Sequence, residues 1–444
     1  MKKMNFRNSI VLFTLIGCCL LATGKGLIFA QFNNASNFKQ MLTKEQVKTA
    51  AENMYKNYTL AAFSDLEQLA EPSRGEVKTS QYVQNECKKK GIDYRVSEID
   101  HLTVFAKIVG TKPSLKTPIT IGYKCDLDAL KRGDKGGFYH GCFHSGHMAI
   151  ALSVMKFLND NKDQFSSTIY FMYQSSEEVV GPSGAEQIIE KGEIQKLNIQ
   201  KLIALHASPE IEVAHVAFRE GIAQASVDEL MIAARSSKAA HVQYQHIPNP
   251  IFALSETIQS LQKLSAQGNP MQPILLNWTK LWTNIDPNSV NSNKVPTEAY
   301  AVASFRVFDE SQRDSLKLRI EKICKGIEMT YNDSLSIVSK FNLNDEKEYK
   351  GVKSVLNDTL LTRELKGIAI DYLGKRFVMD APQRMGGDDI GWYSHIIPTC
   401  IYRLGVGNKA KGWSAGLHSN DFHADPESLK VGTGLMIWMI LQMK

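Results

Sequence analysis

Three short apolar runs constrain the fold of this 444-residue chain more than any other feature. They are rich in β-branched and aromatic residues, as strands buried on both faces of a parallel sheet are, and they lie at Ile119–Tyr123, Thr168–Tyr173 and Leu202–Leu205. Helical patterns alternate with these runs, at Glu45–Asn57, at Thr79–Gly91 and from Gly146 onward. Helices that alternate with buried strands predict an α/β fold built on a layered sheet.

The pattern changes between residues 226 and 340, where the predicted order is β-α-β-β-α-β. The elements are a strand Glu229–Ala234, a helix from Pro250 capped by Asn249, strands Pro273–Trp282 and Thr297–Phe308, a helix Gln312–Tyr331 and a strand Ser334–Val338. This order is the split βαβ arrangement of a self-contained α+β unit. We therefore predict a main domain formed by residues 38–225 and 341–444, with an inserted domain at 226–340. The main domain should end with a helix over Pro426–Met443, capped by Asp425.

Residues 1–30 have the layout of a secretory signal peptide. Basic residues precede an uncharged apolar stretch from Ser9 to Thr23, and small residues lead to Gln31. Lys25 interrupts the stretch before it reaches the length of a membrane span, so no stable span is expected. The segment predicts a secreted or periplasmic protein, and Leu15–Cys18 leaves open a lipoprotein anchored at Cys18.

Charge and cysteine content narrow the function further. Residues 1–30 carry four basic and no acidic residues, so removing them lowers the formal charge from +6 to +2. No basic run with interleaved aromatic residues is found, so no nucleic-acid partner is expected. Beyond Cys18 and Cys19 five of the seven cysteines remain, and an odd number requires a thiol outside any disulfide. Cys142 is the candidate for this free thiol, and we expect it to bind a metal ion as a thiolate.

Candidate ligands follow the predicted strands. Asp126 and Asp128 come after the first strand, the adjacent Glu177 and Glu178 after the second, and His206 ends the third. Because ligands gather at the carboxyl ends of strands in open α/β sheets, these side chains should meet in one crevice, joined by Cys142 and His144 from the loop before a helix. Two adjacent carboxylates repel unless a positive group binds one of them. One glutamate is therefore expected to bind a metal while the other handles a water proton.

In this order the motifs resemble the M20 metallopeptidase family, in its amidohydrolase branch of hippuricase-like, N-acyl-amino-acid and auxin-conjugate hydrolases. The segments that carry the resemblance are Asp126–Leu130, His140–His144, Gln174–Glu178, Ala204–His206, Met385–Asp389 and Leu417–Ser419 in the main domain, and Ala240–His241, His246, Asn293–Pro296 and Arg306 in the insertion. The resemblance implies a zinc-peptidase-like sheet, interrupted by a ferredoxin-like α+β domain that serves as lid and dimerisation domain.

The resemblance also implies roles for individual residues. Two divalent ions per subunit, zinc or manganese, would be held by Cys142, His144, Glu178, His206 and His418. Glu177 would be the general base, and Asp128 would position the metal site. His241 and Asn293 would hold the substrate or the developing oxyanion, with His241 serving the site of a partner subunit. The substrate would be an N-acyl amino acid or a small peptide, and the protein a homodimer through the insertion.

Some positions allow plainer interpretations. His140 and His147 are interpreted as structural, His246 as packing or capping, Asp126 as a neighbour of the site, Met385–Asp389 as a turn in the pocket wall, and Arg306 as a surface charge. The chain also departs from this branch, which usually has Gly and Asp where Phe143 and Ser145 stand. These departures leave open a second hypothesis, an exported binding protein with impaired catalysis.

Overall fold

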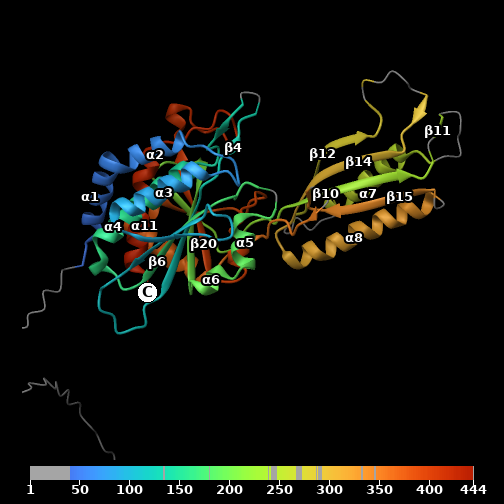
Figure 1. Cartoon of the computed structure of the whole chain (residues 1–444). Helices are drawn as coiled ribbons and strands as arrows, with labels where there is room; N and C mark the ends of the chain where they lie inside the picture. The colour runs from blue at the N-terminus through green and yellow to red at the C-terminus, as the bar shows by residue number, and fades with distance from the viewer. Residues whose placement is uncertain are drawn as a thin grey trace, which may run out of the picture. The chain divides into compact units, whose positions relative to one another are not determined.

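The computed structural model describes residues 41–133, 136–179, 181–238, 240–241, 248–266, 273–286, 288, 293–331, 334–344 and 347–443 (Figure 1). The predicted signal peptide, Cys18 and His246 lie outside the described residues. Within the described part, no helix is long and apolar enough to cross a membrane.

A large mixed sheet forms the framework of the main fold, with the strand order β1-β2-β6-β3-β7-β20-β8-β19. The inner strands β6, β3, β7 and β20 run parallel to one another, as does the outer pair β8 and β19. The strands are β1 Asp93–Val96, β2 Val104–Val109, β3 Thr120–Asp126, β6 Thr168–Gln174, β7 Lys201–Glu212, β8 Val216–Phe218, β19 Val378–Asp380 and β20 Thr399–Gly407. The α/β class and the three buried parallel strands at β3, β6 and β7 are therefore confirmed.

Apolar side chains cover both faces of this sheet. Along β6, Ile169, Phe171 and Tyr173 belong to one hydrophobic cluster and Met172 to another, because successive strand residues point to opposite faces. The first cluster includes side chains from α1 Lys44–Met54, α2 Leu60–Glu67, α3 Val77–Lys90, α4 His144–Asp160, α9 Thr359–Leu373 and α11 Glu427–Gln442. The second includes α5 Gly184–Glu190, α6 Glu193–Lys196 and α10 Gly391–Ser394. Helices on both faces explain why the strands are continuously apolar.

A second, four-stranded antiparallel sheet has the order β12-β14-β10-β15. Together with two helices it follows the β-α-β-β-α-β sequence predicted for this region (Figure 1). Its elements are β10 Asp228–Ser236, α7 Pro250–Ala266, β12 Leu275–Thr283, β14 Glu298–Arg306, α8 Glu310–Glu328 and β15 Leu335–Phe341. Residues between Leu230 and Ile337 form a hydrophobic cluster separate from those of the large sheet. The division into domains at residues 226 and 340 stays a prediction.

Helix ends follow their capping residues. The side chain of Asn249 accepts a hydrogen bond from the backbone of Ile251, which agrees with its predicted role as the cap of α7. The predicted start of α8 at Gln312 is two residues late, because Asp309 caps the helix by accepting from the backbone of Ser311 and Gln312.

The remaining strands of the described residues are short. They are β4 Leu130–Lys131, β5 Phe138–Tyr139, β9 Gly221–Gln224, β11 Ala240–His241, β13 Lys294–Val295, β16 Leu343–Asn344, β17 Lys347–Glu348 and β18 Val355–Asn357. β9 pairs with β18, and β11 pairs with β13.

Candidate metal centre

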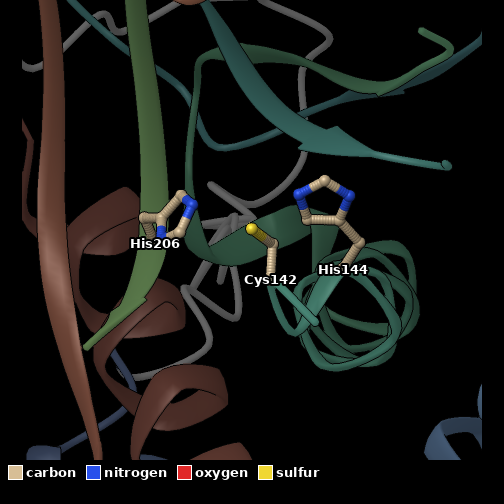
Figure 2. Close-up of side chains that lie close together, drawn as sticks. All are labelled: Cys142, His144 and His206. Carbon is tan, nitrogen blue, oxygen red and sulfur yellow. The ribbon is translucent and has the colours of Figure 1, made fainter. Parts of the chain in front are cut away.

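The thiol of Cys142 and the imidazoles of His144 and His206 form a buried group whose ligand atoms lie within 4.8 Å of one another. His144 is the first residue of α4, Cys142 lies in the loop just before it, and His206 lies on β7. Figure 2 shows the sulfur between the two imidazole rings. Residues more than sixty positions apart therefore meet because the loop before α4 lies beside the central strand.

A second group shares Cys142 and adds Glu178 and His418. The Cys142 sulfur lies 2.8 Å from Nε2 of His418, which lies 3.8 Å from Oε1 of Glu178. The His418 side chain is 56% exposed, so this edge of the site is open to solvent. Its loop is held by a hydrogen bond from the Tyr139 hydroxyl to the His418 carbonyl (2.7 Å).

A third group joins His144 to both Glu177 and Glu178. The three groups overlap, so all five residues predicted to bind metal lie around one centre, with the predicted base Glu177 beside them. Their proximity is observed, whereas their roles as ligand and base stay predictions.

The hydrogen bonding of these side chains suits a cation. Nδ1 of His144 forms a hydrogen bond with the carbonyl of Asp128 (2.8 Å), and Nδ1 of His206 forms one with the carbonyl of Ala207 (2.9 Å). These bonds fix the orientation of each ring and leave its other nitrogen to face a cation. Among the described residues, His144 Nε2 and Glu178 Oε1 are buried without a hydrogen-bond partner. Since buried polar atoms are rarely left unpaired, the donor set fits divalent ions such as Zn²⁺ or Mn²⁺.

Asp128 supports this centre from behind. Its Oδ2 accepts hydrogen bonds from the Glu178 backbone (2.8 Å) and the Ser73 hydroxyl (2.7 Å), and its Oδ1 lies 3.4 Å from His144 Nδ1. Burial alone would lower the pKa of His144, but the carboxylates around it, above all Asp128, raise that pKa to about 10. The surroundings of the ring therefore favour positive charge.

Glu177, the predicted base, lies beside the ligand candidates His144 and Glu178. Its Oε2 is 3.9 Å from Nε2 of His144, and it is grouped with Asp388 and Asp389. Burial, followed by the negative charges of Glu178 and Asp388, raises the pKa of Glu177 well above its ordinary value. A carboxylate in such surroundings binds a proton more readily than an exposed one.

A buried lysine beside the site is the main feature that sequence reasoning missed. Lys124 pairs with Asp126 (2.7 Å), Asp389 (2.9 Å) and Asp388 (3.6 Å). The interpretation of Met385–Asp389 as a plain turn is therefore incomplete, because two of its carboxylates flank Glu177. The signal was a lysine inside an apolar strand, since a charge in such a place needs partners.

Two further histidines of this segment, His140 in the loop and His147 in the first turn of α4, have backbone partners. His140 Nε2 bonds the Leu66 carbonyl (3.2 Å), and burial lowers the pKa of His140 to about 4. His147 Nε2 accepts from the Ala207 backbone (3.1 Å). The structural role of both rings stays an interpretation, because among the described residues Nδ1 of each ring is buried without a partner and His147 also belongs to a group with Asp126 and His144 that could hold a metal ion.

The centre opens into a cavity of about 690 Å³ that residues of both sheets line. Arg306 of β14 enters it, and its Nη1 donates to the Met385 carbonyl (2.7 Å). The interpretation of Arg306 as a plain surface charge is wrong, because its side chain is half-buried and turned to the cavity.

The two substrate-binding candidates of the insertion lie on neighbouring segments. The backbone of His241 on β11 pairs with Lys294 on β13, and Asn293 directly precedes Lys294. Asn293 is exposed and, within the described part of the chain, does not line the cavity.

Comparison with known proteins identifies the family. The sequence model of peptidase family M20/M25/M40 matches residues 122–442. The chain belongs to this family. It is a metal-dependent amidohydrolase of the M20 type, as the resemblance predicted.

Relatives of this M20 protein include named hydrolases. An IAA-amino acid hydrolase, ILR1-like 4, of Arabidopsis thaliana is 26% identical over 372 residues, covering 81% of this chain and 80% of its own. An N-acetyldiaminopimelate deacetylase of Brevibacillus brevis is 26% identical over 384 residues, covering 84% and 94%. The YXEP protein of Bacillus subtilis, a dinuclear metal binding peptidase from the M20 family, has a similar fold, with a TM-score of 0.69 at 20% identity over 90% of this chain and 98% of that one.

The structure accommodates the departures of this M20 protein from its branch. Phe143 adopts a left-handed backbone conformation (φ 63°), the conformation that a glycine would adopt most easily, and its ring is buried against Phe63. Ser145 donates a hydrogen bond to Glu67 of α2. The two substitutions therefore alter the support of the loop while the five ligand candidates stay together.

Proposed function

We propose that this M20 protein hydrolyses the amide bond of N-acyl amino acids or small peptides, using two divalent ions held by Cys142, His144, Glu178, His206 and His418. The observation that carries the proposal is the convergence of these five side chains around one centre with Glu177 beside them. Zn²⁺ and Mn²⁺ suit the mixed thiolate, imidazole and carboxylate set.

Bound ions would supply a Lewis acid and lower the pKa of the attacking water. Glu177 would accept the proton of that water and later donate it to the leaving amine. Its burial and raised pKa support this role, because the carboxyl group can keep the proton between the two steps. Asp128, through its bonds to Glu178 and His144, would hold two ligands in place.

His241 and Asn293 would bind the substrate and donate to the developing oxyanion, an interaction typically worth about 2.7–4 kcal/mol. The pairing of β11, which carries His241, with β13, which Asn293 directly precedes, supports a joint role. We propose further that the segment 226–340 mediates a homodimer in which His241 serves the partner subunit.

We also propose that residues 1–30 direct export to the periplasm or the medium. Mass spectrometry of the mature N-terminus would distinguish cleavage before Gln31 from acylation at Cys18. A mature protein that keeps Met1 would contradict export by this segment.

Glu177→Gln tests the catalytic proposal. With Zn²⁺ or Mn²⁺ supplied, wild-type protein should hydrolyse members of a panel of N-acyl amino acids and dipeptides, and Glu177→Gln should lower kcat by about 10²–10⁴-fold. Elemental analysis should find two ions per chain in both proteins. Glu190→Gln is the matched control, since Glu190 is a half-exposed carboxylate of α5 that pairs with Lys350.

Two other outcomes would distinguish the hydrolase from the alternative, a binding protein with impaired catalysis. Ligands that raise the melting temperature without being hydrolysed by wild-type protein would favour that alternative. Absence of both turnover and bound metal would reject the hydrolase proposal.

A further inference from the structure

Arg403 is a buried cation next to the metal centre. It lies on β20 in register with His206 on the parallel strand β7, so the two side chains emerge on the same face of the sheet. In Figure 2, β20 is the brown strand beside the strand that carries His206. Arg403 is 7% exposed, and it lines the 690 Å³ cavity together with Cys142 and Glu177.

Among the described residues Arg403 makes no ion pair, and the carboxylate of Asp388, which acts on it from farther away and raises its pKa, already pairs with Lys124. Nη2 of Arg403 donates to Oε1 of Gln224 (2.5 Å), a neutral group. Burial and the nearby Arg384 lower the pKa of Arg403 to about 10, so the group is still charged at neutral pH. Since a buried charge without an ion pair is unfavourable, an anion arriving from the cavity would stabilise this side chain.

Arg384 adds a second guanidinium to the same wall. Its backbone bridges to Gln224, and its Nη2 donates to the Ser208 hydroxyl (3.1 Å). Glu210 pairs with one end of the group, but Nε is buried without a partner among the described residues. The two arginines thus flank Gln224 and face one cavity.

Three of the six acidic residues that line the cavity, Asp228, Asp388 and Asp389, are already paired with cations, and Glu177 and Glu178 lie at the metal centre. Lys124 pairs with Asp388 and Asp389, and Arg313 binds Asp228. On the other side of the cavity, β14 contributes a further cation, Arg306. The cavity therefore offers positive charge at two places, which suits a substrate with two carboxylates.

We propose that Arg403 and Arg384 bind a side-chain carboxylate of the substrate, so that the enzyme prefers N-acyl derivatives of acidic amino acids over those of their neutral amides. The inference rests on the proposed hydrolase function and specifies its substrate class. Bidentate guanidinium–carboxylate bonding provides the discrimination, because an amide of the same shape accepts fewer charge-assisted hydrogen bonds.

Matched substrate pairs test this inference. N-acetylglutamate with N-acetylglutamine, and N-acetylaspartate with N-acetylasparagine, differ only by a carboxylate or an amide. Metal-loaded wild-type enzyme should show at least a tenfold higher kcat/KM for the acid in one pair, and Arg403→Gln or Arg384→Gln should reduce that ratio to below threefold. Arg363→Gln is the control, because Arg363 is an exposed arginine of α9 and should leave the ratio unchanged. Equal kcat/KM within both pairs, or an unchanged ratio in both variants, would overturn the inference.

An inhibition experiment tests the same inference without relying on a single substrate or a single variant. Glutarate should inhibit the hydrolysis of any neutral panel substrate at least tenfold more strongly than its monoamide, glutaramate; both compounds keep one carboxylate for the metal ions. If Arg403→Gln does not fold, the inference is still tested by this wild-type comparison and by Arg384→Gln, which replaces a partly exposed side chain.

Hydrolysis without any acid preference would reject the subsite alone. Absence of hydrolysis of the whole panel would reject the proposed function, and a glutarate preference in thermal stabilisation would then still report the subsite.

Discussion

Phe143 shows how one side chain decides what its neighbours can be. It precedes α4 with φ 63° and ψ 25°, a conformation that costs residues with a Cβ about 1–2 kcal/mol. Its ring is 1% exposed and lies 5.5 Å from that of Phe63. Truncating a buried phenylalanine to alanine costs about 3–5 kcal/mol, which exceeds the strain. The ring also fills the space beside Gly146, where an added Cβ would overlap it.

The effect of Gly146→Ala on stability should therefore change sign when Phe143 is replaced by glycine. In wild-type protein we expect a loss of about 1–3 kcal/mol in the free energy of unfolding, because the new methyl group collides with the Phe143 ring. In a Phe143→Gly background, the same change should stabilise the protein by up to about 1 kcal/mol, since alanine favours helix more than glycine does. Urea unfolding of the four proteins measures this coupling, and additive effects would contradict the contact.

Glu76 should make stability depend on pH. It is buried, its Oε1 accepts from the Ser176 backbone (2.7 Å), and burial raises the pKa of Glu76 to about 8. A folded-state pKa above the unfolded value means that the neutral carboxyl's contribution is complete at acid pH and is lost as pH rises toward 8. Glu76→Gln removes this loss, so it should stabilise metal-free protein relative to wild type increasingly, by about 1.4 kcal/mol per pH unit between about pH 5 and 7. Chemical denaturation at several pH values checks the trend, and a constant difference would contradict it.

At the scale of elements, one aspartate ties the start of β10 to α8. Both carboxylate oxygens of Asp228 accept from Arg313 (2.7 and 2.8 Å), and Oδ1 also accepts from Lys317 (2.8 Å) and from Asn342 at the end of β15 (2.5 Å). Arg313 in turn donates to the Lys350 carbonyl (2.7 Å). The chain segments that enter and leave the four-stranded sheet thus share one buried network.

Asp228→Asn should destabilise the protein by about 3–5 kcal/mol, because it leaves Arg313 and Lys317 without their buried counter-charge. Asp380→Asn provides the contrast. The Asp380 side chain is 86% exposed beside Lys366, so its removal should change stability by less than about 1 kcal/mol. The two values come from the same denaturation experiment, and similar losses for both variants would contradict the assigned role of burial.

For the whole molecule, metal removal should lower thermal stability. The centre draws ligand candidates from α4, β7 and three loops, so an ion bound there would hold separate parts of the chain together. Binding at a thousandfold excess over Kd stabilises a fold by about 4 kcal/mol, so a chelator should lower the melting temperature by several degrees. Glu177→Gln should keep this shift, whereas His206→Ala should reduce it. An equal shift in His206→Ala would contradict its role as a ligand.

The elements that could be predicted from the sequence are those whose formation depends on a local pattern of residues. The strands β3, β6 and β7 are legible because they are continuously apolar, and α7 because Asn249 and Pro250 mark its start. The Lys124 network was not legible, since its pairing with Asp389 spans 265 residues and depends on how distant loops pack. Likewise, Arg403 resembles any charge in a strand until the register places it beside His206.

All five cysteines of the described chain, Cys87, Cys125, Cys142, Cys324 and Cys400, are buried and free. The described fold contains no covalent cross-link, so its architecture does not depend on an oxidising environment. Recombinant protein lacking residues 1–30 should accordingly mature in a reducing bacterial cytosol without help from disulfide-forming catalysts, and a reductant in the buffer should leave its unfolding transition where it was.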